Sequence, residues 1–298
     1  MDQKIIYKNI DVTIRREDLL HPLISGNKFR KLKYNILHAQ KENFKGLITF
    51  GGAFSNHILA TAAAAKEYNF KSIGIIRGDE LKDNYRNNPT LKFAEDLGMQ
   101  FIFVSREEYK HRNSEIYLNK LISNYPEYFV VPEGGTNLLA IKGCEEILNN
   151  SDSDFNYICC ASGTGGTISG IINTLNTNQI ALSFPVLKDE SLKESIKNLI
   201  KKTDSDNWNI IDSYHFNGYG KVNDDLIKFI NQFFNTFGIP LDPVYTGKLF
   251  YGIFDMIDNN YFNPNDKILA IHTGGLQGIH GMNQILRKKN KETIKVIF

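Results

Sequence analysis

Four short apolar segments of this chain each run into a turn that holds two or three glycines, and strand-like and helix-like segments alternate through most of the sequence. The connections are too long for hairpins, so the alternation predicts parallel sheets with helices on both faces, and the number of strands favours two sheets over one. The carboxyl ends of parallel strands share one edge, where ligands bind, so the glycine turns should ring a crevice. The segments, each with its glycines, are 47–50 (Gly51, Gly52), 128–131 (Gly134, Gly135), 157–161 (Gly163, Gly165, Gly166) and 268–272 (Gly274, Gly275).

The charge and cysteine content argue against several classes of function. The 298 residues include 35 basic and 33 acidic side chains, and this net charge of +2 gives no reason to expect a nucleic-acid or membrane-surface partner. No apolar run approaches the length of a membrane span, and no signal-like pattern opens the chain. The three cysteines lack the spacing of a zinc site. We expect a reduced, cytoplasmic protein without a bound metal.

The turn at residues 162–167 is the strongest candidate for an anion site. Its sequence is Ser-Gly-Thr-Gly-Gly-Thr, and it joins a strand-like segment to a helix-like one. Glycine amides can converge on an anion there, the hydroxyls add donors, and a helix N-terminus adds partial positive charge. The turn lacks the lysine of a P-loop and the spacing of a dinucleotide fingerprint. We therefore predict a phosphate cradle, against the alternative of a merely tight turn.

A second polar turn lies at residues 51–57. Ser55, Asn56 and His57 follow Gly51-Gly52 and precede a helix-like segment, so they could contact a carboxylate or a cofactor oxygen at the crevice. The alternative is plain helix capping by Ser55 or Asn56. His57 fits a capping or core histidine better than a base.

Lys28 lies just past Gly26, in a basic segment that reads Gly-Asn-Lys-Phe-Arg-Lys-Leu. A lysine held in a dry pocket has a lowered pKa and becomes the nucleophilic amine that a Schiff base requires. The segment alone favours a solvated basic turn that opens a helix. Tyr245 could stack on a flat ring, and Tyr219, between two glycines, offers a second exposed phenol, but each is weak evidence alone.

Together these features resemble the aminocyclopropanecarboxylate deaminase and D-cysteine desulfhydrase family of pyridoxal-phosphate enzymes, which share the tryptophan-synthase-β fold (fold type II). The resemblance implies an α/β structure of two open, mostly parallel three-layer αβα domains with the cofactor in the crevice between them. Residues 1–32 and 126–298 would form the large domain and residues 33–125 the small one. The stretches that carry the resemblance, in the family's order, are 16–19, 26–32, 51–57, 89–98, 133–135, 218–223, 242–248 and 272–275.

The resemblance also implies roles at the cofactor, pyridoxal 5′-phosphate. Lys28 would attach it covalently, Asn56 would bond the hydroxyl oxygen of its ring, and Tyr245 would stack on the ring. Lys31 would join the loop at 162–167 in holding the phosphate. The implied cofactor-binding residues are Lys28, Lys31, Asn56, Ser162, Gly163, Thr164, Gly165, Gly166, Thr167, Tyr245, Thr273 and Gly274.

The implied partner is a small amino-acid substrate, surrounded by Ser55, Asn56 and His57, with Ser55 near its carboxylate. Besides Lys28, the resemblance makes Ser55, Tyr219 and Tyr245 catalytic. It also implies a homodimer.

The implied enzyme is a lyase or deaminase, and two positions favour one branch. The family's deaminases carry Glu and Leu where this chain has Thr246 and Thr273, the pattern of the desulfhydrases. A carboxylate beside the ring nitrogen keeps it protonated and deepens the electron sink. A hydroxyl at Thr273 suits the loss of a good leaving group such as a thiolate. We expect a D-cysteine desulfhydrase; the alternatives are 1-aminocyclopropane-1-carboxylate deaminase and a non-catalytic ligand-binding homologue.

Overall fold

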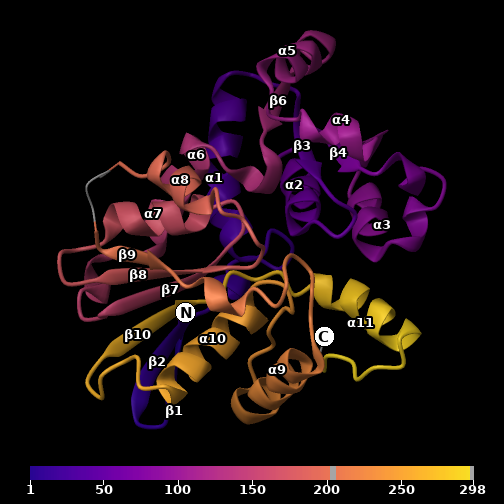
Figure 1. The fold of residues 1–298 in the computed structure, drawn as a ribbon. Coiled ribbons are helices and arrows are strands. Elements are labelled where there is room, and N and C mark those ends of the chain that lie inside the picture. The colour runs from indigo at the N-terminus through magenta and orange to yellow at the C-terminus, as the bar shows by residue number, and fades with distance from the viewer. Residues whose placement is uncertain (202–205, 296–298) are drawn as a thin grey trace.

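The computed structural model describes residues 1–201 and 206–295, and its strands form two sheets (Figure 1). In the described part of the chain, the larger sheet has six strands in the order β1-β2-β10-β7-β8-β9, all parallel except for β1 against β2. Its strands are β1 (Asp2–Tyr7), β2 (Ile10–Arg15), β7 (Tyr157–Ser162), β8 (Ile180–Pro185), β9 (Trp208–Ile210) and β10 (Lys267–Ile271).

The smaller sheet is parallel throughout and has the order β5-β4-β3-β6. Its strands are β3 (Gly46–Gly51), β4 (Lys71–Arg77), β5 (Met99–Val104) and β6 (Tyr128–Val131). Because β6 pairs with β3, it joins this sheet although it lies beyond the predicted boundary at residue 126. The division into two domains stays a prediction.

The helices cover both faces of each sheet. The α-helices are α1 (Asn27–Lys41), α2 (Asn56–Glu67), α3 (Pro89–Asp96), α4 (Arg106–Lys110), α5 (Glu115–Asn124), α6 (Leu138–Cys144), α7 (Gly166–Thr174), α8 (Leu192–Lys197), α9 (Asp224–Phe237), α10 (Thr246–Asp258) and α11 (Gly278–Lys288). Single 3-10 turns are η1 (Glu17–Leu19), η2 (Asp79–Leu81), η3 (Tyr85–Asn87), η4 (Glu133–Gly135), η5 (Glu145–Ile147), η6 (Asn150–Asp152) and η7 (Asp212–Tyr214). The predicted α/β fold with parallel sheets and helices is confirmed.

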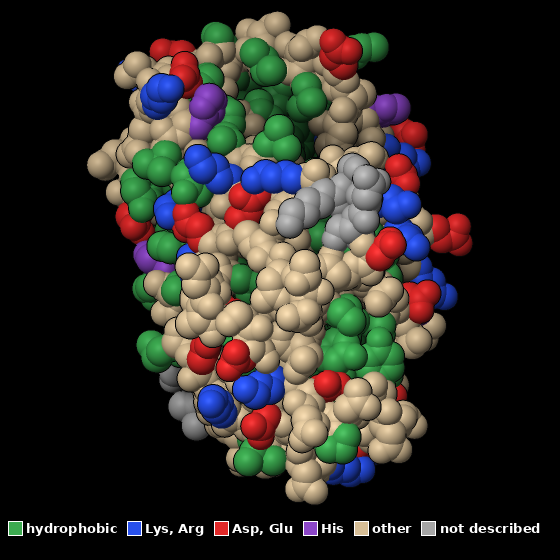
Figure 2. All heavy atoms as spheres, turned by 90° about the vertical axis from the view of Figure 1, so that its left-hand side faces the viewer, with side chains coloured by type: hydrophobic (Ala, Val, Ile, Leu, Met, Phe, Trp, Pro, Cys, Tyr) green, Lys and Arg blue, Asp and Glu red, His purple; other side chains and the backbone are tan. Residues whose placement is uncertain are grey.

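Strand β7 shows how the larger sheet divides its core. Side chains alternate across a strand, so Cys159 packs with α9 and α10 while Ile158 and Cys160 pack with α7 and α8 on the other face. In Figure 1 these helix pairs lie on opposite sides of the sheet. The three cysteines are buried and unbonded, as their positions in the sequence suggested. Figure 2 shows acidic and basic side chains interspersed over the face it presents.

Several predicted elements were wrong in extent. The sequence at about 106–123 predicts one polar helix, but α4 and α5 are separate, since the Ser114 side chain caps a new helix by accepting a hydrogen bond from the amide of Tyr117. The sequence at 210–214 predicts a strand, but β9 ends at Ile210 and η7 follows. Helix α1 begins at Asn27 rather than at residue 31, which places Lys28 within its first turn. None of the described helices is long and apolar enough to cross a membrane.

A buried arginine fixes the edge of the larger sheet near the chain's start. Arg15, at the end of β2, donates to both carboxylate oxygens of Asp152 at 2.7 Å and to the carbonyl of Ile147 at 2.7 Å. It also bonds Asp2 in β1. The guanidinium therefore joins the strand pair to the segment that leads into β7.

Substituting Asp152 by Asn should lower the free energy of unfolding by about 3 kcal/mol, because it leaves a buried cation short of a partner. Urea denaturation of the purified protein measures the change. Asp154→Asn is the matched control, since that carboxylate is exposed and makes only a long contact, of 3.5 Å, with Lys267 Nζ. Equal loss of stability in the two variants would contradict the role given to Arg15.

Candidate functional site

The anion loop follows β7 and leads into α7, as the sequence predicted. Ser162 ends the strand and its hydroxyl accepts from Ser183 at 2.8 Å, while Gly165 has a left-handed φ of 80° that glycine adopts without strain. A Cβ on Gly166 would lie 2.8 Å from Thr136 Oγ1 and 3.1 Å from Lys31 Nζ. Glycine at 166 therefore lets a lysine ammonium approach the start of α7. This pairs a cation with a helix N-terminus, which is the arrangement that binds phosphate.

Lys28 and Lys31 lie one helical turn apart on α1, and their ammonium groups share one acceptor. The carbonyl of Gly134 lies 3.4 Å from Lys28 Nζ and 3.0 Å from Lys31 Nζ, and Lys31 also donates to Thr136 Oγ1 at 3.0 Å. Burial, and then the charge of Lys31, lower the pKa of Lys28 to about 7. Burial lowers the pKa of Lys31 too. The charge of Lys31 and burial thus act in the same direction on the amine of Lys28.

The start of α1 rests on the turn after β10. Gly26 has φ 64°, and a Cβ there would lie 1.9 Å from the carbonyl oxygen of Thr273. The amide of Asn27 donates to that same oxygen at 3.2 Å, and Asn27 Nδ2 donates to Thr167 Oγ1 at 2.8 Å. Only glycine at 26 permits this approach, because a side chain would overlap the carbonyl oxygen of Thr273. Gly26 therefore allows α1 to bring Lys28 to the anion loop.

Asn56 opens α2 and holds an unsatisfied polar atom. Its Oδ1 is buried without a hydrogen-bond partner among the described residues, and its Nδ2 lies 2.7 Å from where a Cβ on Gly275 would be. Buried polar atoms are rarely left unpaired, so this amide fits a site for a bound ligand. Ser55 caps the helix, accepting from the amide of Ile58 at 3.3 Å.

His57 faces the interior of the smaller sheet. The ring is 2% exposed, and its Nε2 lies 2.8 Å from the hydroxyl of Thr49. Burial lowers its pKa well below the usual value, and the nearby charges of Lys28 and Lys31 add to this effect. The ring is therefore a buried imidazole beside the lysine pair, and its part at the site stays a prediction.

Tyr245 and Tyr219 pack edge to face, with ring centroids 6.1 Å apart. Tyr245 lies over the anion loop, because a Cβ on Gly163 would touch its ring at 3.4 Å. Burial raises the pKa of both phenols, so both stay protonated. Asp242 fixes Tyr245 by accepting its amide at 2.9 Å.

Thr246 and Thr273 differ in where they lie. Thr246 is fully buried and donates to Asp242 Oδ1 at 2.9 Å, so its hydroxyl serves the turn before α10. Thr273 lies in the turn after β10 and meets Gly26 through its carbonyl. Gly274 and Gly275 follow with φ of 78° and 92°. The structure thus brings Thr273 and Gly274 to the start of α1.

Lys248 was not singled out in the sequence, although it holds the loop that carries Tyr219. The ammonium group is buried and donates to the carbonyls of Val186 at 3.1 Å, His215 at 2.9 Å and Gly218 at 2.8 Å. Its position after a Tyr-Thr-Gly turn gave no signal of this role.

Thr136 and Thr164 were also missed as a pair in the sequence, and their hydroxyls lie 2.6 Å apart. The available signal was that Thr136 follows a glycine pair, as Thr164 follows Gly163.

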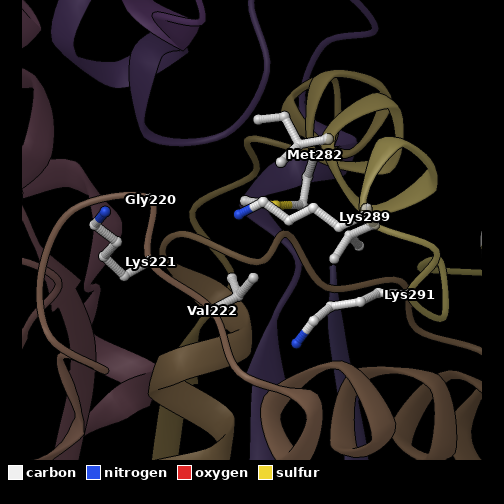
Figure 3. A pocket seen from close by; sticks show the side chains of 8 residues that line it. Gly220, Lys221, Val222, Met282, Lys289 and Lys291 are labelled. Carbon is white, nitrogen blue, oxygen red and sulfur yellow. The ribbon is translucent and has the colours of Figure 1, made fainter.

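Beyond Tyr219 the loop borders a cavity of about 250 Å³ (Figure 3). Gly220, Lys221 and Val222 line it from the loop, and Met282 and Lys289 line it from α11. Tyr219 is 52% exposed as a whole residue, whereas its hydroxyl end is buried beside Tyr245, which is why its pKa is raised. The loop is therefore anchored by Lys248 at Gly218 and bordered by open space just after Tyr219.

The residues gathered here fit pyridoxal phosphate. The cofactor needs an amine with a lowered pKa, a phosphate site, a polar partner for its ring and an aromatic face. The amine would be that of Lys28, and the phosphate site would be the loop at 162–167 with Lys31. The unpaired amide of Asn56 would be the polar partner of the ring, and Tyr245 would be its aromatic face.

The chain matches known proteins along most of its length. Residues 6–274 match the model of the family described as "Pyridoxal-phosphate dependent enzyme". A mitochondrial protein of Arabidopsis thaliana named bifunctional D-cysteine desulfhydrase/1-aminocyclopropane-1-carboxylate deaminase is 31% identical over 91% of this chain and 73% of its own. A protein of Salmonella typhi named D-cysteine desulfhydrase is 27% identical over 90% and 88%.

A solved structure also resembles the whole fold. It is described as an ACC deaminase homologue, has 30% sequence identity and a TM-score of 0.79, and the match covers 93% of this chain and 89% of the other. The family match, the relatives and the donor set at Lys28 agree. The chain belongs to the family of pyridoxal-phosphate-dependent enzymes.

Proposed function

We propose that this enzyme catalyses α,β-elimination from a small amino acid, with D-cysteine as the favoured substrate, yielding pyruvate, sulfide and ammonia. The observation that carries the proposal is the amine of Lys28, whose pKa is lowered to about 7 beside an anion loop. The names of the relatives support the class of reaction, and they include both desulfhydrase and deaminase. We further propose a cytoplasmic homodimer.

Each group around Lys28 has a proposed part in holding the cofactor. Lys28 provides the covalent attachment. Lys31 and the amides of the loop at 162–167 bind the phosphate, Asn56 bonds the ring hydroxyl oxygen, and Tyr245 covers the ring. Thr273, followed by Gly274, faces the ring nitrogen. Pyridoxal phosphate, when bound, supplies an electron sink that stabilises negative charge at the substrate α-carbon.

The chain's own groups then move the protons. Ser55 and the N-terminus of α2, which includes His57, bind the substrate carboxylate. Lys28 Nζ would take the proton from the substrate α-carbon. The leaving group departs from the β-carbon with the electron pair of its bond. The Tyr219 hydroxyl, kept protonated by its raised pKa, is placed to donate to the departing sulfur, and Tyr245 orients it.

The desulfhydrase is favoured over the deaminase because the carboxylate that lies beside Gly275, that of Asp242, is engaged by the protein itself. Asp242 lies near Gly275, but its oxygens accept the amides of Val244, Tyr245 and Thr246 and the Thr246 hydroxyl. A hydroxyl at Thr273 leaves the ring closer to neutral, which suffices for a thiolate leaving group and less well for opening a cyclopropane. The deaminase is kept as the second candidate because relatives carry that name.

The purified holoenzyme should release sulfide and pyruvate in equal amounts from D-cysteine. It should form little 2-oxobutyrate from 1-aminocyclopropane-1-carboxylate, since Thr273 provides no charge to hold the ring protonated. Sulfide and keto-acid assays on both substrates, with L-cysteine as the stereochemical control, measure this. Faster turnover of the cyclopropane would make the enzyme a deaminase.

Replacing Lys28 by Ala should lower turnover by about a thousandfold or more and prevent covalent attachment of the cofactor, because no other amine is proposed to take its place. The Lys33→Ala variant is the matched control on the same helix. Its ammonium group is exposed and paired with Glu146 at 2.7 Å, so turnover should stay within about twofold. Full activity in the Lys28 variant would reject the proposed site, and absence of turnover in the wild type would favour the ligand-binding homologue.

The rate at which the apoprotein takes up pyridoxal phosphate covalently should rise with pH and level off above about pH 7, where Lys28 becomes neutral. Only the neutral amine attacks the aldehyde, so a lowered pKa moves the rise to lower pH. Visible absorbance of the bound cofactor follows the rate. Free lysine is the comparison, since its rate should keep rising toward its pKa of about 10.4. The same profile for both would show that Lys28 is an ordinary lysine.

A further inference from the structure

The tyrosine loop, residues 215–221, consists of two consecutive turns with Tyr219 in the second. The amide of Gly218 donates to the carbonyl of His215 at 3.0 Å, which closes the first turn. The amide of Lys221 donates to the carbonyl of Gly218 at 3.1 Å, which closes the second. Gly218 belongs to both turns, so the position of the Tyr219 phenol depends on both.

The backbone of the tyrosine loop is held in an unfavourable conformation. Phe216 and Asn217 have left-handed φ of 50° and 65°, and this region is costly for a bulky residue such as Phe216. Gly218 and Gly220 have φ of 121° and 67°. The end of the loop borders the cavity of about 250 Å³ that α11 also lines (Figure 3). Packing is therefore incomplete on that side, and polar contacts must hold the strained backbone in place.

The ammonium group of Lys248 binds the carbonyls that close both turns. It donates to His215 at 2.9 Å and to Gly218 at 2.8 Å, and its third hydrogen bond goes to the carbonyl of Val186 at 3.1 Å. Val186 directly follows β8, and its amide donates to the carbonyl of Ser162, the first residue of the anion loop, at 3.0 Å. One cation therefore ties both turns of the tyrosine loop to the end of β8, beside the anion loop.

Lys248 also lies in the first turn of α10, next to the second phenol of the site. Tyr245 is the residue before α10, and its ring packs edge to face against that of Tyr219. Lys248 is 1% exposed, and burial lowers its pKa to about 8, while the charge of Asp242 acts against this effect. The ammonium form therefore prevails at pH 7, and it fixes the phenol of the loop relative to the phenol beside α10.

We infer that Lys248 is a positioning residue for the leaving group, because by binding both turns of the tyrosine loop it holds the Tyr219 hydroxyl where it donates a proton to a departing thiolate. This inference rests on the proposed function and adds the residue that keeps its proton donor in place. Lys248 acts through Tyr219 and does not contact the substrate. Its loss should therefore slow elimination chiefly where the leaving group needs a proton. A thiolate is basic and gains from protonation as it departs, whereas chloride does not.

The test compares cysteine with β-chloroalanine, each in the enantiomer that the enzyme accepts, for the wild-type and Lys248→Met holoenzymes. Turnover of cysteine should fall at least about tenfold in the variant, because a well-placed general acid contributes about a hundredfold or more. Turnover of β-chloroalanine should fall by less than about threefold, since chloride needs no general acid. An equal loss with both substrates would overturn the inference.

A double variant tests whether the two residues act as one unit. Tyr219→Phe should show the same selective loss with cysteine, because it removes the proton donor itself. Adding Lys248→Met to it should cause no further selective loss, since both changes remove one and the same proton transfer. Losses that multiply would show that Lys248 acts independently of Tyr219.

Chemical rescue separates the missing ammonium group from a damaged helix. In Lys248→Ala, ammonium chloride should raise cysteine turnover at least about threefold, because the free ion can donate to the same three carbonyls. Tetramethylammonium chloride at the same concentration has no N–H donor and should not. Equal effects of the two salts would count against the anchor. Lys221→Gln is the matched control, since it removes an equal charge from an exposed side chain of the same loop, and both turnovers should stay within about twofold.

Proteolysis gives a readout that does not depend on activity. Lys221 is exposed, and trypsin cleaves after a lysine where the backbone opens locally. Cleavage after Lys221, identified by mass spectrometry, should be severalfold faster in Lys248→Met than in wild type. Lys248→Gln keeps two N–H donors without the charge and should lie between them, and it replaces the Met variant if that one does not fold. Unchanged cleavage in the variants would overturn the anchor. Absence of elimination from both substrates in wild type would reject the proposed function instead, and cleavage would then decide on the anchor.

Discussion

The site depends on one backbone contact, which joins Gly26 at the start of α1 to Thr273 in the turn after β10. Gly26 and Thr273 approach so closely that a single methyl group at 26 would overlap a carbonyl oxygen. This contact seats the first turn of α1 on the turn after β10, and both lysines follow from that placement. Side chains could not hold the helix as closely, because each would insert its own volume between the two backbones. The chemistry proposed for Lys28 thus rests on a glycine that makes no contact with a ligand itself.

The charge of Lys28 and Lys31 is left without a carboxylate partner, unlike that of the two buried arginines near the chain's start. Arg15 and Arg16 are buried with carboxylates at 2.7 Å. Among the described residues, Lys28 and Lys31 share one carbonyl, and Lys31 also donates to one hydroxyl. Cations held out of water without a counterion are costly in free energy, and the cost is lowered either by loss of a proton or by a bound anion. Loss of a proton would lower the cost at Lys28, and a bound phosphate would lower it at Lys31.

The sequence was informative wherever a local rule decides the structure. The glycine turns lie after β3, β6, β7 and β10, where the apolar segments before them predicted strands, and the loop at 162–167 lies where a strand meets a helix, as its composition indicated. The predicted start of α1 was late because Gly26 and Asn27 form the cap by contacts with Thr273, some 250 residues away, rather than by a capping side chain. Helix α11 was not predicted, since its charged and apolar residues follow an irregular glycine-rich segment.

Lys28 and Lys248 show that a lowered pKa does not by itself identify a reactive amine. Burial lowers the pKa of both lysines, to about 7 and about 8. Lys248, however, donates to three carbonyls, which uses all three hydrogens of an ammonium group and holds it in place. Lys28 has one long contact, at 3.4 Å, with an acceptor that Lys31 binds more closely. A nucleophilic lysine must lose a proton and turn toward its target, and only the poorly bonded amine can do both at little cost. The number of satisfied hydrogen bonds, more than the pKa, separates the lysine that builds the loop from the lysine proposed to carry the chemistry.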